Sequence, residues 1–82
     1  MNKMKKHREA IRELLNVERA RARASYPEIS ARLREYGIEQ SATNLRNKTM
    51  RGQMEAGLFL AVLDVLGVKR IEVPDLIDDL KR

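Results

Sequence analysis

The chain has 82 residues and a formal net charge of +5, from 17 Lys and Arg against 12 Asp and Glu, and it contains no Cys. This length allows one domain with a single small core and excludes an enzyme that needs a deep cleft and a lid. The absence of Cys excludes disulfides and thiolate metal sites and fits a reducing cytosol, so we expect a cytoplasmic location.

Positive charge is concentrated in the first part of the chain. Residues 1–52 contain 13 Lys and Arg against 6 Asp and Glu, whereas residues 53–82 contain 4 against 6. The two parts therefore carry +7 and −2. A basic part followed by an acidic one favours a polyanionic partner, although ordinary solvation of helices by Arg and Lys is the alternative.

A first helix is predicted from near Lys5 to near Arg23, with residues 1–8 as a frayed basic end. At 100° per residue, its apolar side chains fall on one arc of roughly 100°: Met4, Ile11, Leu14, Leu15 and Ala22. Five cations fall within roughly 60° beside that arc: Lys5, Arg8, Arg12, Arg19 and Arg23. A basic stripe beside a buried face favours phosphate contacts along the rim of the helix. His7 and Glu18 interrupt the apolar arc, so a stop or bend before Arg23 is the alternative.

The next segment opens with a helix start signal. Ser25 and Glu28 have the spacing of a capping box, and Pro27 is tolerated in a first turn because its missing N–H would be unpaired there. Ile29 and Leu33, four residues apart, give this helix its buried side.

A second short helix is predicted over about residues 42–50. Gly37 fits the left-handed residue that ends the preceding helix, and Ser41 is a plausible N-cap for the next. Leu45, with either Ala42 or Thr49, is expected to face the core, and Gly52 closes the helix. Polar and basic side chains are left for solvent or a ligand: Asn44, Arg46, Asn47, Lys48 and Arg51.

The remainder of the chain predicts a buried helix and a tail. Residues 53–67 are apolar on nearly all faces, which indicates the central helix of the core or a face covered by a subunit. Residues 71–82 are expected to form a tail or a short helix after Pro74. The whole chain is thus predicted to be a single all-α domain, a compact bundle of about five helices.

Signals for catalysis and cofactors are lacking. His7 has no second ligand candidate at helical spacing other than carboxylates, and the acids at Asp75, Asp78 and Asp79 lack the spacing of a calcium loop. No nucleophilic triad or phosphate-cradling glycine loop occurs. We therefore expect no enzyme, no catalytic residues, no metal, no cofactor, no small-molecule substrate and no membrane span.

The order of packing residues and turn glycines resembles the lambda-repressor-like helix-turn-helix domains of the Cro and repressor type. It consists of Ile29-Ser30-x-x-Leu33, Gly37-Ile38, Leu45, Gly52 and Phe59-x-x-x-Leu63-x-x-Leu66-Gly67-Val68. The likeness extends over roughly residues 9–70, with the helix-turn-helix at 25–52. The run from Asn44 to Gly52 is similar to a family of small uncharacterised bacterial domains with an N-L-x-x-K-x-x-R-G signature.

The chain departs from the repressor pattern in its turn. Three residues separate Leu33 from Gly37, and the interval from Ile38 to Leu45 is longer than usual, so we expect a lengthened turn. Tyr26 stands where a phosphate-gripping Gln is common, and it either donates to phosphate or packs on the first helix.

The resemblance implies a regulator of transcription, of a small bacterial or phage type, that binds double-stranded DNA as a homodimer. The base-reading candidates are Gln40, Thr43, Asn44, Arg46 and Asn47. The phosphate-contact candidates are Tyr26, Lys48, Arg51, Lys5, Arg8, Arg12, Arg19 and Arg23. The alternatives are a protein–protein interaction module, antitoxin-like or adaptor-like, that uses the apolar fourth helix and the tail, and a binder of structured RNA.

Overall fold

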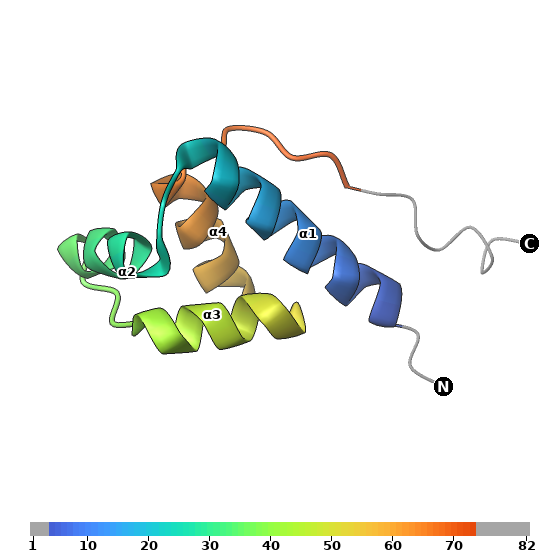
Figure 1. The fold of residues 1–82 in the computed structure, drawn as a ribbon, viewed down its shortest axis with the longest axis horizontal. Coiled ribbons are helices and arrows are strands. Elements are labelled where there is room, and N and C mark those ends of the chain that lie inside the picture. Colours follow the sequence, from blue (N-terminus) through green and yellow to red (C-terminus); the bar gives the residue numbers. More distant parts are fainter. Residues whose placement is uncertain (1–3, 74–82) are drawn as a thin grey trace, which may run out of the picture.

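The computed structural model describes residues 4–73, and these form four helices with no strand. The helices are α1 (Lys5–Ala22), α2 (Tyr26–Glu35), α3 (Ala42–Arg51) and α4 (Ala56–Val65). Helix α3 packs on both α1 and α2, and α4 packs on α2 (Figure 1). The chain beyond α4 runs back along α1. The prediction of an all-α domain is confirmed for this part of the chain.

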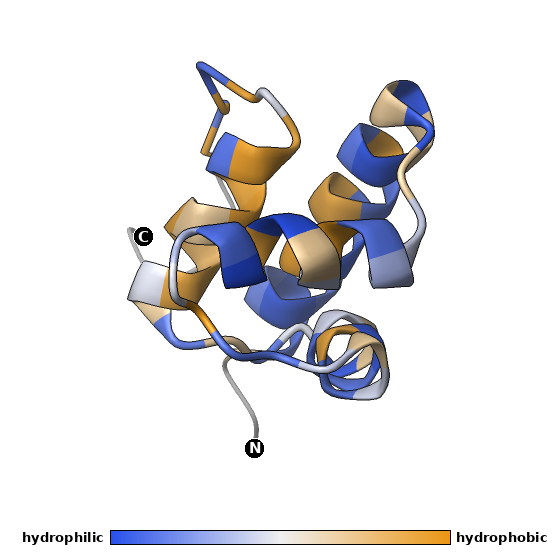
Figure 2. Cartoon of the chain, turned by 90° about the vertical axis from the view of Figure 1, so that its left-hand side faces the viewer, coloured by the Kyte–Doolittle hydropathy of each residue, from blue (hydrophilic) through white to orange (hydrophobic). Residues whose placement is uncertain are grey.

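The core is aliphatic and draws on every helix. It contains Leu15 from α1, Ile29 and Leu33 from α2, Leu45 from α3, and Leu58, Val62 and Leu63 from α4. Apolar parts of the ribbon gather where the helices face one another, and hydrophilic parts cover the outer faces (Figure 2). Leu33 is completely buried, so the four helices enclose a solvent-free core.

The two central helices begin where the capping signals predict. The Ser25 hydroxyl accepts from the Glu28 N–H at 3.2 Å, and the Glu28 carboxylate accepts from the Ser25 N–H at 3.1 Å, which completes the capping box. This backbone hydrogen bond and the Ser25 hydroxyl lower the pKa of Glu28, because both favour the charged carboxylate. The Ser41 hydroxyl accepts from the Asn44 N–H at 3.0 Å in the same manner.

A left-handed residue follows each of the four helices. Gly37, Gly52 and Gly67 have φ of 80°, 63° and 77°, which glycine adopts freely because it lacks a Cβ. The residue after α1 is Arg23, with φ of 54°. After α2, the Ile38 N–H donates to the Leu33 carbonyl at 3.0 Å, as the glycine signal predicted.

Three boundaries differ from the predictions. Four helices occupy residues 4–73 where about five were expected, and the expected last turn after Pro74 lies outside the described residues. Residues 5–8 of the supposedly frayed end are the first turn of α1. Helix α4 is shorter than the predicted 53–67, because Glu55 accepts from the Gly57 N–H as its N-cap and Gly67 follows its end.

The faces of α1 and α4 also differ from the predictions. On α1, Leu15 is buried and Met4 and Ala22 are exposed, because these two residues lie at the two ends of this long helix. Helix α1 continues without interruption past Glu18 to Ala22. Leu60 of α4 is 64% exposed, so α4 is not buried on all sides.

Candidate nucleic-acid interface

Helix α3 presents a polar face to solvent. Leu45 and Thr49 turn into the core with 2% and 4% of their surface exposed, which settles the prediction between Ala42 and Thr49 in favour of Thr49. The opposite side carries four of the predicted base-reading residues, and all four are exposed: Thr43, Asn44, Arg46 and Asn47. Their side chains are therefore free to meet a ligand that approaches α3.

A recess of about 160 Å³ adjoins this face where the first half of α1 meets the end of α3. Three of the α1 stripe residues and one from α3 line it: Lys5, Arg8, Arg12 and Arg51. Glu9 and Met50 complete the lining. Four cations against one carboxylate make this recess attractive to an anion such as a phosphate group.

The close approach of α1 to the end of α3 depends on Gly52. Its Cα lies so near the backbone carbonyl of Arg8 that any Cβ at this position would collide with that carbonyl. Arg8 offers only donors to the Gln53 amide, so the amide is assigned with its oxygen toward Arg8; in that orientation the oxygen accepts from Nη2 at 2.9 Å and from Nε at 3.2 Å. Gln53 therefore fixes one edge of the Arg8 guanidinium and leaves the other edge for the recess.

The rest of the predicted basic stripe lies elsewhere. The Arg19 guanidinium stacks over the Tyr26 ring at 4.4 Å from its centroid, and Tyr26 packs against the core. Arg23 is exposed at the end of α1. Since Arg8 and Arg19 are eleven residues apart, about 16 Å along a helix, the five stripe residues divide into two groups.

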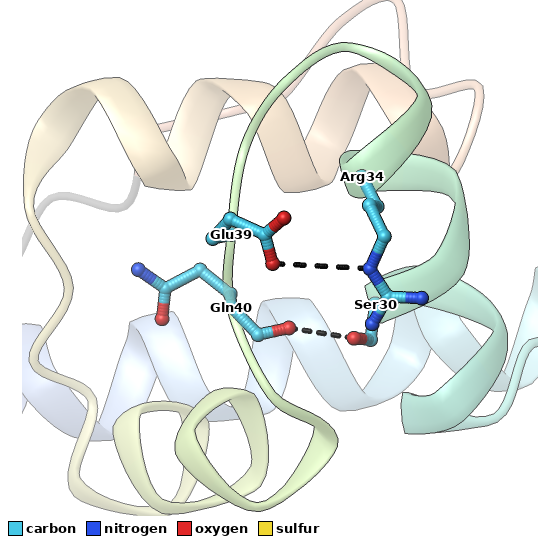
Figure 3. Close-up of polar contacts among 4 residues, drawn as sticks. All are labelled: Ser30, Arg34, Glu39 and Gln40. Atoms are coloured by element: carbon cyan, nitrogen blue, oxygen red, sulfur yellow. Dashed lines mark hydrogen bonds and ion pairs between the residues drawn. The ribbon is translucent and has the colours of Figure 1, made fainter.

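The connection between α2 and α3 is held by polar contacts. The buried hydroxyl of Ser30 donates to the backbone carbonyl of Gln40 at 2.6 Å, and Arg34 pairs with Glu39 at 3.8 Å (Figure 3). The Gln40 side chain then meets α3, where its Oε1 accepts from Lys48 Nζ at 3.1 Å. Two predicted DNA contacts, one for a base and one for a phosphate, are thus bonded to each other.

Three positions in or beside this surface escaped the sequence-based prediction. Ser30 carries the connection, Gln53 orients Arg8, and Met50 is 52% exposed beside the cation recess. Each partner of Ser30 and Gln53 belongs to another element, so no local spacing reveals the pair. Met50 directly follows the buried Thr49, and successive residues on a helix point 100° apart. That step was the one signal in the sequence that Met50 would be exposed.

An apolar groove lies on the other side of α1. It has a volume of about 490 Å³, and its apolar lining comes from α1, α4 and the segment after α4: Ala10, Ile11, Leu14, Val17, Phe59, Ile71 and Val73. His7, Glu13 and Glu72 stand among them. Lys5 and Leu14, like Arg8 and Val17, are nine residues apart, so the groove is about 180° around α1 from the cations.

Features of two other classes of site are missing from the described part of the chain. Within residues 4–73, no group of three or more His, Asp or Glu side chains is placed to hold a metal ion. No helix among these residues has the length and apolar content needed to cross a membrane.

The fold and this surface define a small four-helix domain with a polar helix face beside a cluster of cations. The chain belongs to the family described as a domain of unknown function (DUF6471), whose model matches residues 7–71. That match extends over most of the chain and includes nearly all of the four helices. Searches of curated proteins and of solved structures found no match.

Proposed function

We propose that this protein binds double-stranded DNA with sequence preference and regulates transcription. One observation supports the proposal: four exposed side chains of types that are able to pair with bases lie on α3, beside a recess that four cations from α1 and α3 surround. A helix that reads base edges needs such a neighbouring group, because phosphate contacts fix its register on the duplex. The α2–α3 pair then acts as a helix-turn-helix whose lengthened turn spans residues 36–41.

Each side chain receives a role from its chemistry. Asn44 and Asn47 suit bidentate pairing with adenine, and Arg46 suits guanine. Lys5, Arg12 and Arg51 hold phosphates at the recess, while Arg8 uses the edge that Gln53 leaves open. Arg19 and Arg23, at the far end of α1, and Tyr26 of α2, on whose ring Arg19 stacks, are proposed to contact a second run of phosphates.

The proposed DNA complex is a dimer, and the apolar groove is its proposed interface with a second copy. The groove lies opposite the cations on α1, so two copies joined there keep both DNA-binding faces open. Its polar members are two acids and a histidine, and the two acids make it a poor surface for DNA. The lining is ten residues, below the 20–30 per side typical of stable interfaces, so we expect a weak dimer that DNA strengthens.

Selection of bound duplexes from a random DNA library at about 150 mM salt tests the proposal directly. We expect an enriched motif with two related halves about one helical turn apart. Arg46→Ala should broaden the preferred sequence, whereas Arg51→Ala should weaken all duplexes alike and reduce the salt slope by about one. Arg70→Ala, at an exposed position outside this face, is the control.

A flat selection, with affinity that only follows salt, would refute sequence-specific binding. The groove supports a second candidate in that event, a protein–protein interaction module of the antitoxin or adaptor type. Oligomer formation without nucleic acid, combined with loss of duplex binding by about 150 mM salt, favours that candidate.

A further inference from the structure

We infer that Gln40 and Lys48 form a single hydrogen-bonding unit that selects guanine over adenine at one position of the DNA site. The inference rests on the proposed function, because it concerns which base the α3 surface prefers. It begins from the hydrogen bond in which Lys48 Nζ donates to Gln40 Oε1 at 3.1 Å. Both side chains are half-buried, so solvent competes only partly for this bond.

The backbone fixes where this unit stands. Gln40 lies just before the N-cap Ser41, at the end of α3 that a helix-turn-helix directs toward bases. The buried Ser30 hydroxyl donates a hydrogen bond to the backbone carbonyl of Gln40 at 2.6 Å. The Gln40 side chain points away from Ser30 (Figure 3). Lys48 stands two turns along α3, so the loop and the helix each supply one member.

The bond changes what Gln40 offers to a base. A free glutamine amide pairs with adenine by accepting from N6 and donating to N7. In this structure an ammonium group, which has donors and no acceptor, occupies one of the two lone pairs of the amide oxygen and places a positive charge beside the other. The groups that the unit offers to an acceptor are the amide N–H and the remaining ammonium N–H, so donors predominate in it.

A unit in which donors predominate matches guanine and is a poor match for adenine. Guanine presents two acceptors in the major groove, N7 and O6, whereas adenine presents one acceptor and the N6 donor. That N6 donor would face a second donor in the unit. We therefore expect guanine to be preferred at this position by on the order of tenfold.

Removal of the ammonium group should reverse the preference. Lys48→Met keeps the length of the side chain and frees the Gln40 oxygen, so the variant should favour adenine at the same position. Lys48→Arg retains donors and should keep guanine. Lys69→Met, at an exposed position after α4, is the matched control and should leave every preference unchanged.

The measurement is the affinity of each protein for four duplexes that differ only at the affected base pair of the selected motif. A wild-type protein that selects no motif refutes the proposed function. If the wild-type protein selects a motif and Lys48→Met weakens all four duplexes equally without changing it, the inference alone is refuted. Lys48 is then a phosphate contact.

A second variant keeps the inference testable if Lys48→Met does not fold. Gln40→Glu places a carboxylate against the same ammonium and offers an acceptor to the base. We expect the preferred base to change from guanine to cytosine, whose N4 group donates. An unchanged guanine preference in Gln40→Glu would overturn the role of Gln40.

Discussion

Arg23 carries a conformational strain that the other helix ends avoid. It has φ of 54°, whereas glycine occupies the left-handed position after α2, α3 and α4. A side chain with a Cβ costs about 1–2 kcal/mol in this conformation. Arg23 is also one of the predicted phosphate contacts, so the chain retains a cation at a position where glycine would be more stable.

Arg23→Gly should therefore stabilise the fold by about 1 kcal/mol, partly offset by the greater freedom of glycine in the unfolded chain. Arg21→Gly, two residues earlier inside α1, should instead destabilise it by about 1 kcal/mol. Urea unfolding of both variants measures the difference. Loss of stability in both would show that the Arg23 conformation is not strained.

Glu28 makes the capping box of α2 depend on pH. Its pKa is lowered from its ordinary value of 4.5, chiefly by the backbone N–H of Ser25, then by the Ser25 hydroxyl, with a small contribution from Arg32. A carboxylate whose pKa is lower in the folded state adds stability above its unfolded pKa and loses it as pH falls through the folded pKa.

Glu28→Gln should lower the thermal midpoint at neutral pH, and this difference should shrink below about pH 4.5 and vanish in stronger acid. Glu35→Gln, exposed at the end of α2, controls for removal of one negative charge. Thermal unfolding followed by circular dichroism from about pH 3 to 7 measures both. A Glu28→Gln difference that stays constant over that range contradicts the capping role.

At the scale of elements, the turn between α3 and α4 determines how closely α1 packs against the end of α3. Gly52 combines a φ of 63° with direct contact against the Arg8 carbonyl, whereas Gly37 has a φ of 80° and no atom within 4 Å of the place where a Cβ would stand. Both glycines need a positive φ, but only Gly52 is packed against another helix. Substitutions at the two positions therefore distinguish the energy of a left-handed turn from the energy of a close helix contact.

Gly37→Ala should cost about 1–2 kcal/mol from its backbone conformation alone. Gly52→Ala should cost at least about 3 kcal/mol, because the collision with Arg8 must also be relieved by moving α1. Denaturant unfolding measures the free energy of unfolding of the two variants. Equal decreases would mean that α1 tolerates displacement from the α3–α4 turn.

At the scale of the whole molecule, charge and apolar surface are divided between opposite sides of α1. The cations face the end of α3, and the apolar groove lies on the opposite side of α1, where Phe59 and residues 71–73 line it. Under the proposed function, this division allows one small domain to hold a polyanion and a second copy at once.

Val17, 51% exposed in the groove, is the position that tests the dimer. Val17→Glu should abolish concentration-dependent association, because it places a charge in the apolar contact beside Glu13. Leu60→Glu, at 64% exposure on α4 and outside the groove, should associate as the wild type does. Sedimentation velocity over a range of concentrations measures both. Unchanged association of Val17→Glu would remove the groove as the interface.

Elements that depend on local chemistry could be predicted from the amino-acid sequence. Ser25 with Glu28, Ser41, and the glycines at 37 and 52 set the limits of α2 and α3, because capping and left-handed turns involve residues only a few positions apart. The burial of Leu45 followed from helical periodicity, and most of the exposed polar face of α3 followed with it, whereas periodicity left the choice between Ala42 and Thr49 open until the fold was known.

The meeting of distant side chains, by contrast, depends on the folded structure. In the fold, Gln40 contacts Lys48 and Arg8 contacts Gln53. Arg19 is separated from Lys5, Arg8 and Arg12, although these four residues belong to one stripe in the sequence. Periodicity gives the direction of a side chain around its own helix and carries no information on how far along that helix a neighbour crosses. The crossing point depends on packing around Gly52, and packing is a property of the assembled core.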